Sequence, residues 1–151
     1  MTKKQVLWKK GPGKLGVMKP LLGTWRAFAD SPMGRVTCTR SFTPVLGGTY
    51  VQLVAKWKYA KTTYEEMAFY GVGDDRAVCF WSFTSDGKRS EGKIADVTDI
   101  HPQAIGFEAR MPAGLARMAY WPDEDGGVAW AVEAKGKKGW KRFIEHHYKG
   151  Q

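Results

Sequence analysis

The chain has 151 residues, of which 43% are hydrophobic and 26% charged, and its formal net charge is +9 with the histidines counted as neutral. This length and composition fit one domain with one core, and the 13% of aromatic residues argues against intrinsic disorder. No apolar run approaches the roughly 18–20 residues of a membrane-spanning helix. The start of the chain has lysines with no apolar stretch behind them, so we expect neither an anchor nor a signal peptide. With 2 cysteines a disulfide scaffold is excluded, which favours a reducing, cytoplasmic location.

Residues 1–20 differ in composition from the rest of the chain. They are rich in lysine, contain no acidic residue and include several breakers, among them Gly13 and Pro20. Such a segment is typical of a basic arm and not of a core element. We therefore expect a basic N-terminal arm over residues 1–20 and a single domain over residues 21–151.

From residue 23 onward, apolar or alternating runs are separated by short turns rich in Gly, Pro, Asp and Ser, a pattern typical of meandering β-strands. Helical periodicity is nowhere sustained. The runs predict about ten strands: Gly23–Asp30, Gly34–Thr43, Thr49–Tyr59, Thr63–Val72, Arg76–Ser85, Arg89–Asp96, Ala104–Met111, Leu115–Trp121, Val128–Lys135 and Gly139–Tyr148.

Short connections without intervening helices predict an all-β fold in which the strands run up and down, each antiparallel to the next. A sheet of about ten strands tends to close and so remove its edges. We therefore expect a single up-and-down antiparallel β-barrel, with a two-sheet sandwich as the alternative.

Alternation predicts which side chains face the barrel interior, because successive residues of a strand point to opposite faces. In two strands the inward set includes a cation, and a guanidinium facing inward is costly unless an anion pairs with it or water reaches it. The predicted inward sets are Val36, Cys38, Arg40 and Phe42; Val51, Leu53, Ala55, Trp57 and Tyr59; Ile105, Phe107, Ala109 and Met111; Val128, Trp130, Val132 and Ala134; and Trp140, Arg142, Ile144, His146 and Tyr148.

Two motifs, Leu22-Gly23-Thr24-Trp25 and the turn at residues 44–50, resemble those of the lipocalin-like (calycin) β-barrels. In outline the chain is similar to the ten-stranded nitrobindin-type barrels and to a related bacterial family of unknown function. The resemblance implies structural roles for Gly23 and Trp25, with Arg142 of the last strand lying over the Trp25 ring.

The same resemblance implies haem ligation by a last-strand histidine, and His146 is the only inward candidate because His147 faces the other way. This chain has Ala27 and Phe28 where the family keeps small residues near the cofactor, so we expect no cofactor, with haem as an alternative. We also expect no metal site and no covalent catalysis by Cys38 or Cys79, which both fall within strands.

Charge is distributed unevenly between the turns, because in an up-and-down barrel alternate turns lie at opposite ends. One end collects basic residues and should attract anions. The basic end holds Arg35, Lys58, Lys61, Lys88, Arg89, Lys135, Lys137 and Lys138, and the opposite end holds Asp74, Asp75, Asp96, Asp99, Asp123, Glu124 and Asp125.

These features favour a non-enzymatic barrel that binds a hydrophobic or amphipathic, acidic small molecule in its interior. The alternatives are the haem barrel, a nucleic-acid or anionic-membrane binder that uses the basic end, and an enzyme that uses interior acids and arginine; a homodimer is left open. Arg40 could instead be structural, reaching a loop or pairing with Glu65. The residues expected to bind the ligand are Arg40, Trp57, Phe107, Met118, Tyr120, Trp130, Arg142 and His146.

Overall fold

A computed structural model describes residues 6–151, apart from the side chain of residue 125. The first five residues of the arm, which include Lys3 and Lys4, lie outside the described part. The strands are β1 (Gly23–Ser31), β2 (Gly34–Val45), β3 (Tyr50–Lys58), β4 (Thr63–Val72), β5 (Val78–Thr84), β6 (Arg89–Ala95), β7 (Ile105–Met111), β8 (Gly114–Pro122), β9 (Val128–Gly136) and β10 (Gly139–Gly150). Three short 3-10 helices complete the fold: η1 (Lys14–Leu21), η2 (Leu46–Gly48) and η3 (Glu124–Gly126).

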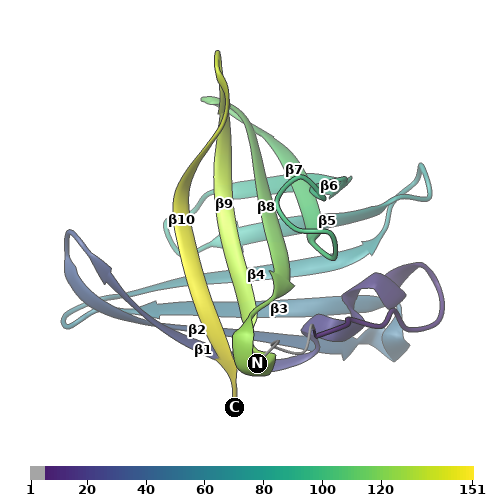
Figure 1. The fold of residues 1–151 in the computed structure, drawn as a ribbon, viewed down its shortest axis with the longest axis horizontal. Helices are drawn as coiled ribbons and strands as arrows, with labels where there is room; N and C mark the ends of the chain where they lie inside the picture. The colour runs from purple at the N-terminus through teal and green to yellow at the C-terminus, as the bar shows by residue number, and fades with distance from the viewer. Residues whose placement is uncertain (1–5) are drawn as a thin grey trace, which may run out of the picture.

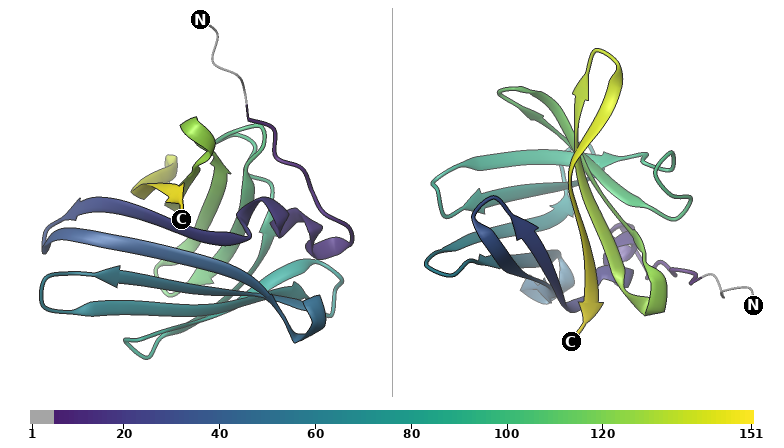
Figure 2. Two further views of the ribbon diagram at one scale, coloured as in Figure 1. Left: turned by 90° about the horizontal axis from the view of Figure 1, so that it is seen from below. Right: turned by 60° about the vertical axis from the view of Figure 1, so that its left-hand side comes forward.

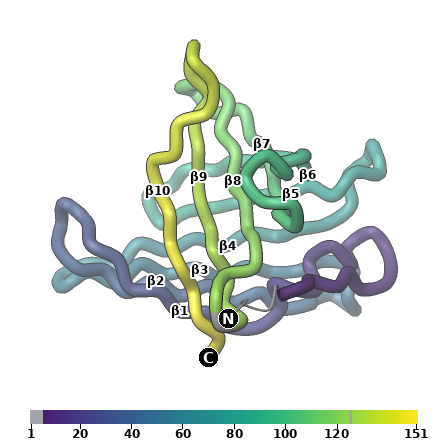
Figure 3. The backbone as a smooth tube through the Cα atoms, in the orientation of Figure 1, coloured from purple at the N-terminus to yellow at the C-terminus, as the bar shows by residue number. Residues whose placement is uncertain are grey.

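The ten strands pair in chain order, each antiparallel to the next, and β1 pairs with β10 to close one barrel (Figure 1). This confirms the predicted all-β, up-and-down barrel and excludes the sandwich. Every strand boundary lies within two residues of the predicted one. Figure 3 follows the meander as a continuous backbone path.

The connections fall into two sets at opposite ends of the barrel. We call the end with the β1–β2, β3–β4, β5–β6, β7–β8 and β9–β10 turns the hairpin end, and the end with the other connections and η1 the helix end. Gly34 and Gly114 follow Pro-containing turns of the hairpin end with φ of 99° and 127°, a conformation that favours glycine.

The seam between β1 and β10 is short. Only Trp25 with Gly150 and Arg26 with Lys149 are paired, so the strands meet at the helix end and diverge toward the hairpin end (Figure 1). The barrel is therefore more tightly closed at the helix end.

The helix η1 packs against β3 and β4 at the helix end (Figure 2, left). Met18 is fully buried there, as is Leu21. The prediction that residues 1–20 contribute no core element is therefore wrong for Met18, because the last part of the arm folds over the end of the barrel.

The interior beyond η1 is filled largely by aromatic rings. Tyr70 lies 5.0 Å from Phe107 between ring centres, and Phe42 lies 5.6 Å from Tyr120. These side chains are at most 3% exposed. This part of the barrel is densely packed, so any free space inside the barrel lies elsewhere.

Candidate functional site

Arg40 lies inside the barrel, as the alternation of β2 predicts. Its same-face neighbours Cys38 and Phe42 belong to the hydrophobic core, and Arg40 itself is only 2% exposed. At this position side chains, and not water, surround the guanidinium. Its partners therefore decide whether its charge is tolerated.

The Arg40 guanidinium makes few polar contacts for so deeply buried a group. Nη2 donates a hydrogen bond to Oη of Tyr120 at 2.7 Å, and the same nitrogen lies 3.8 Å from Oε1 of Glu66. The guanidinium carbon lies 4.5 Å from the centre of the Trp130 ring, within range of a cation–π contact. The Trp57 ring is farther, at 5.8 Å.

Two donors of Arg40 remain without an acceptor. Neither Nε nor Nη1 has a hydrogen-bond partner within residues 6–151, and the buried Nε1 of Trp130 has none either. Buried N–H groups are nearly always paired, because leaving one unpaired costs about 1–3 kcal/mol. Arg40 and Trp130 thus present three buried donors without partners.

Arg40 keeps its charge in this position. Burial by itself lowers the pKa of its guanidinium, but Tyr120, Tyr148 and Glu66 raise it above its ordinary value. The group is therefore a permanent cation, and its free donors favour an anionic acceptor.

Glu66 is the acidic side chain that faces Arg40 inside the barrel, and it is not among the residues predicted from the sequence. The alternative that Arg40 pairs with Glu65 is wrong, because Glu65 faces outward, where its Oε1 lies 3.6 Å from Nζ of Lys56. Glu66 points inward and its Oε2 accepts a hydrogen bond of 2.5 Å from Oγ of Ser82. The alternation of β4, with buried Ala68 and Tyr70 on the same face, is the signal that could have identified it.

A cavity of about 250 Å³ lies beside these groups, toward the hairpin end. Its wall combines the Arg40 and Glu66 side chains with mostly apolar ones. The lining residues are Arg40, Glu66, Phe80, Ser90, Phe107, Ala109, Met111, Ala116, Arg117, Met118, Trp130, Val132 and Phe143.

The predicted ligand-binding residues fall into three groups. Arg40, Phe107, Met118 and Trp130 line this cavity. Trp57 and Tyr120 lie behind it, each with its ring 6.5 Å from that of Trp130 between centres. His146 and Arg142 lie elsewhere.

His146 points inward, as predicted, but packs against other side chains. Its ring centre lies 5.2 Å from that of Trp130, its Nδ1 lies 3.2 Å from Oη of Tyr148, and it does not line the cavity. Burial, Arg40 and His147 lower the pKa of His146 to about 4, so the imidazole is neutral near pH 7.

Trp130, directly opposite His146 on β9, and Tyr148, two residues farther along β10, both pack against the His146 ring. Of Ala27 and Phe28, which were expected to lie near a cofactor, Phe28 is 60% exposed on the outer face, so its predicted role in excluding haem is wrong. Only Ala27 of that pair faces the interior, where it is buried.

The predicted contact between Arg142 and Trp25 is wrong. Trp25 pairs with Gly150, eight residues beyond Arg142 along β10, and its Nε1 donates a hydrogen bond to the Leu21 carbonyl at 2.8 Å. Gly23 opens β1 with φ of 127°, which accounts for a glycine at this position. Arg142 therefore does not point into the barrel interior, where a bound ligand would lie.

A β-bulge explains why β10 departs from simple alternation. The pairing with β9 shifts between Arg142 and Ile144, leaving Phe143 as the extra residue. One inserted residue moves every side chain before it to the other face. Arg142 and Trp140 therefore face outward, whereas Ile144 lies on the inner face.

On the outer face, Arg142 joins a row of ion pairs across three strands. Glu133, only 6% exposed, accepts hydrogen bonds from Arg117 and Arg142 at 2.7–3.0 Å. Arg117 also donates to both carboxylate oxygens of Asp99, at 2.7 and 3.0 Å. The Trp140 ring covers Arg117 at 4.3 Å from its centre. We call Asp99, Arg117, Glu133 and Arg142 the outer ladder.

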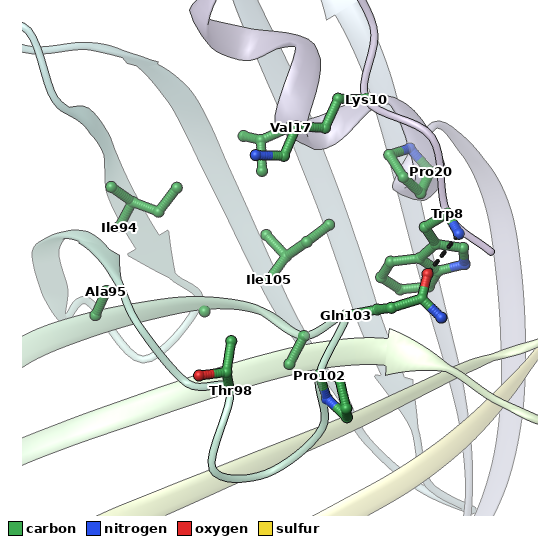
Figure 4. A pocket seen from close by; sticks show the side chains of 12 residues that line it. Trp8, Lys10, Val17, Pro20, Ile94, Ala95, Thr98, Pro102, Gln103 and Ile105 are labelled. Carbon is green, nitrogen blue, oxygen red and sulfur yellow. Dashed lines mark hydrogen bonds between the residues drawn. The ribbon is translucent and has the colours of Figure 1, made fainter.

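A second cavity, of about 310 Å³, lies between the arm and the β6–β7 connection (Figure 4). The backbone N of Trp8 donates to Oε1 of Gln103 at 2.7 Å, and Nε2 of Gln103 donates to the carbonyl of Val6 at 2.7 Å, which fixes the arm in place. The unpartnered buried donors found in residues 6–151 do not lie in this cavity. The cavity beside Arg40 is therefore the stronger candidate site.

Within the described residues, no group of His, Cys, Asp and Glu side chains is arranged to hold a metal ion. No helix of this part of the chain is both long enough and apolar enough to span a bilayer. In outline the ten-stranded antiparallel barrel fits a calycin-like barrel. In comparisons with known proteins, no family model and no curated protein sequence matched this chain.

Proposed function

We propose that the barrel binds a small amphipathic molecule whose acidic group accepts hydrogen bonds from Arg40 and Trp130. The observation that carries the proposal is the set of three buried donor nitrogens without acceptors, all on residues that line one cavity. An anionic oxygen would supply the missing acceptor and would balance a cation that is only 2% exposed.

Glu66 limits the charge of the ligand. Its carboxylate lies 3.8 Å from Arg40 and already offsets part of the positive charge. A ligand with two or more negative charges near this point would be repelled by Glu66, because like charges interact strongly in a poorly solvated site. We therefore expect a monoanion, such as a carboxylate.

The walls and volume of the cavity define the rest of the ligand. Phe80, Phe107, Met118 and Trp130 provide apolar and aromatic contacts. The volume of about 250 Å³ is slightly below the roughly 300–1,000 Å³ common for ligand pockets. The site thus suits a small aromatic or short aliphatic acid, or the acidic end of a longer molecule that extends toward the hairpin end.

The thiol on the same face of β2 as Arg40 favours binding over covalent chemistry. Cys38 lies on the same inward face of β2 and is fully buried. Burial raises the pKa of its thiol to about 11, so the reactive thiolate is scarce near neutral pH.

The proposal is tested with an acid and its uncharged amide, 1-naphthoate and 1-naphthamide, whose binding is measured by calorimetry. Arg40→Met should weaken naphthoate binding about 10- to 150-fold, because a hydrogen bond to a charged group contributes about 1.5–3 kcal/mol. Naphthamide should lose only a few-fold in affinity. Equal losses for both probes would mean that Arg40 is structural.

Neighbouring glutamates provide a matched control. Glu66→Gln removes the negative charge inside the cavity and should strengthen naphthoate binding, whereas Glu65→Gln, on the outer face, should leave it unchanged. Met118→Trp keeps the charges and fills the cavity, so it should abolish binding of both probes. Full binding by Met118→Trp would place the ligand elsewhere and overturn the proposal even if Arg40→Met folds poorly.

A further inference from the structure

Exposed basic side chains surround the hairpin end. In four of its five hairpins they lie in the turn or at the adjoining strand ends, and in the β7–β8 hairpin Arg110 precedes the turn. These exposed basic residues are Arg35, Lys58, Lys61, Lys88, Arg89, Arg110, Lys135, Lys137 and Lys138. Asp30 and Asp86 also lie at this end, but the cations outnumber them, so the hairpin end is electropositive.

Apolar side chains are exposed among these cations. Met33, in the β1–β2 turn, is 63% exposed, and Phe143, at the bulge of β10, is 59% exposed. Met111, at the end of β7, is 39% exposed. Phe143 and Met111 also line the cavity beside Arg40, so these apolar groups border the cavity at its hairpin end.

The helix end differs in charge. Its connections carry Asp74, Asp75, Asp96, Asp99 and Asp123, and its basic residues belong mainly to the arm. Figure 2 (right) shows the hairpin turns spread around the other end of the barrel, well away from the arm. One end of the molecule thus combines cations with exposed apolar side chains.

We propose that the hairpin end docks on the surface of a phospholipid bilayer that contains anionic lipids. Lysine and arginine side chains would contact the headgroups, and Met33 and Phe143 would enter the boundary between headgroups and acyl chains. A nucleic acid would use the same cations, and Phe143 has a ring on which a base could stack, but Met33 and Met111 offer no planar face. The combination of charge and apolar tips favours a bilayer. Because it concerns an outer surface, this inference does not depend on the ligand of the cavity.

The test is flotation of the full chain with vesicles of phosphatidylserine and phosphatidylcholine in equal parts, compared with phosphatidylcholine alone. We expect binding only to the mixed vesicles, weakened by salt. Replacing Lys61, Lys137 and Lys138 together by Gln should lower the affinity by on the order of 100-fold, since each lysine near an anionic surface contributes about 1 kcal/mol, or about fivefold. Met33→Gln should weaken the binding that remains at high salt.

The arm supplies a control of equal charge. Replacing Lys9, Lys10 and Lys19 by Gln also removes three exposed lysines, but at the helix end. The proposal is overturned if this variant loses as much affinity as the hairpin variant, or if phosphatidylcholine vesicles bind equally well. It is also overturned if the chain binds single-stranded RNA in a gel-shift assay but does not float with either kind of vesicle.

Discussion

Arg40 inside the barrel and Arg117 on its outer face are almost equally buried, at 2% and 5% exposure, yet their partners differ. Arg117 makes four hydrogen bonds to Asp99 and Glu133, whereas Arg40 makes one, to Tyr120. A buried arginine whose donors are paired with carboxylates, as in Arg117, stabilises the fold. Arg40 keeps free donors beside a cavity, and we propose that a ligand meets them.

The largest effect that tests this contrast is on stability. Arg117→Met removes two of the three hydrogen bonds to the buried Glu133 carboxylate, and we expect the free energy of unfolding to fall by about 3–5 kcal/mol. Arg40→Met replaces a poorly paired cation with an apolar side chain and should change it by about 1 kcal/mol or less. Urea unfolding followed by circular dichroism measures both, with exposed Arg26→Met as the control. A loss in Arg40→Met as large as that in Arg117→Met would contradict the contrast.

The adjacent residues His146 and His147 give a similar contrast between the inner and outer faces in how stability depends on pH. The pKa of His146 is lowered to about 4, below its ordinary value of 6.5, so between these pH values the unfolded chain binds a proton that the native chain does not. Stability should therefore fall by up to about 3 kcal/mol as the pH drops from about 6.5 to 4. His146→Gln should remove this part of the pH dependence, as measured by urea unfolding at a series of pH values.

His147 is the matched control on the outer face. Burial lowers its pKa, but hydrogen bonds to Glu145 and Asp123 outweigh burial and raise it. Its contribution is thus present below about pH 6.5 and lost as the pH rises through its native pKa. Since the His147 side chain is 54% exposed, the effect should be below about 1 kcal/mol. If His147→Gln abolishes the acid-side loss of stability, the two histidines have been assigned the wrong faces.

The smallest effect is expected when haem is added to the protein. Because Trp130 and Tyr148 pack against the His146 ring, titration with haem should give no tight shift of the Soret band. His146→Ala should then give the same spectrum as the natural chain. A tight shift that this substitution abolishes would show that the interior rearranges to hold the cofactor.

Much of the fold could be predicted from the sequence because strand alternation and turn composition are local properties. The inward positions of Val36, Arg40, Phe107 and Trp130 follow from period-two patterns, and the two barrel ends follow from counting turns. Four of the residues expected to bind a ligand indeed line one cavity.

Tertiary structure alone decided the features that set the character of the site. The bulge at Phe143 reversed the facing of Arg142 and Trp140, and it arises from the pairing of β10 with β9, which no pattern within β10 reports. Alternation in β4 could have shown that Glu66 and not Glu65 points inward, but its approach to Arg40 depends on the curvature of the barrel, which brings the inner faces of β2 and β4 together. The free donors of Arg40 and Trp130 exist because the side chains that distant strands place around them supply no acceptor. Sequence determined most of the side chains that enter the barrel, and only packing across the barrel determined which of them were left without partners.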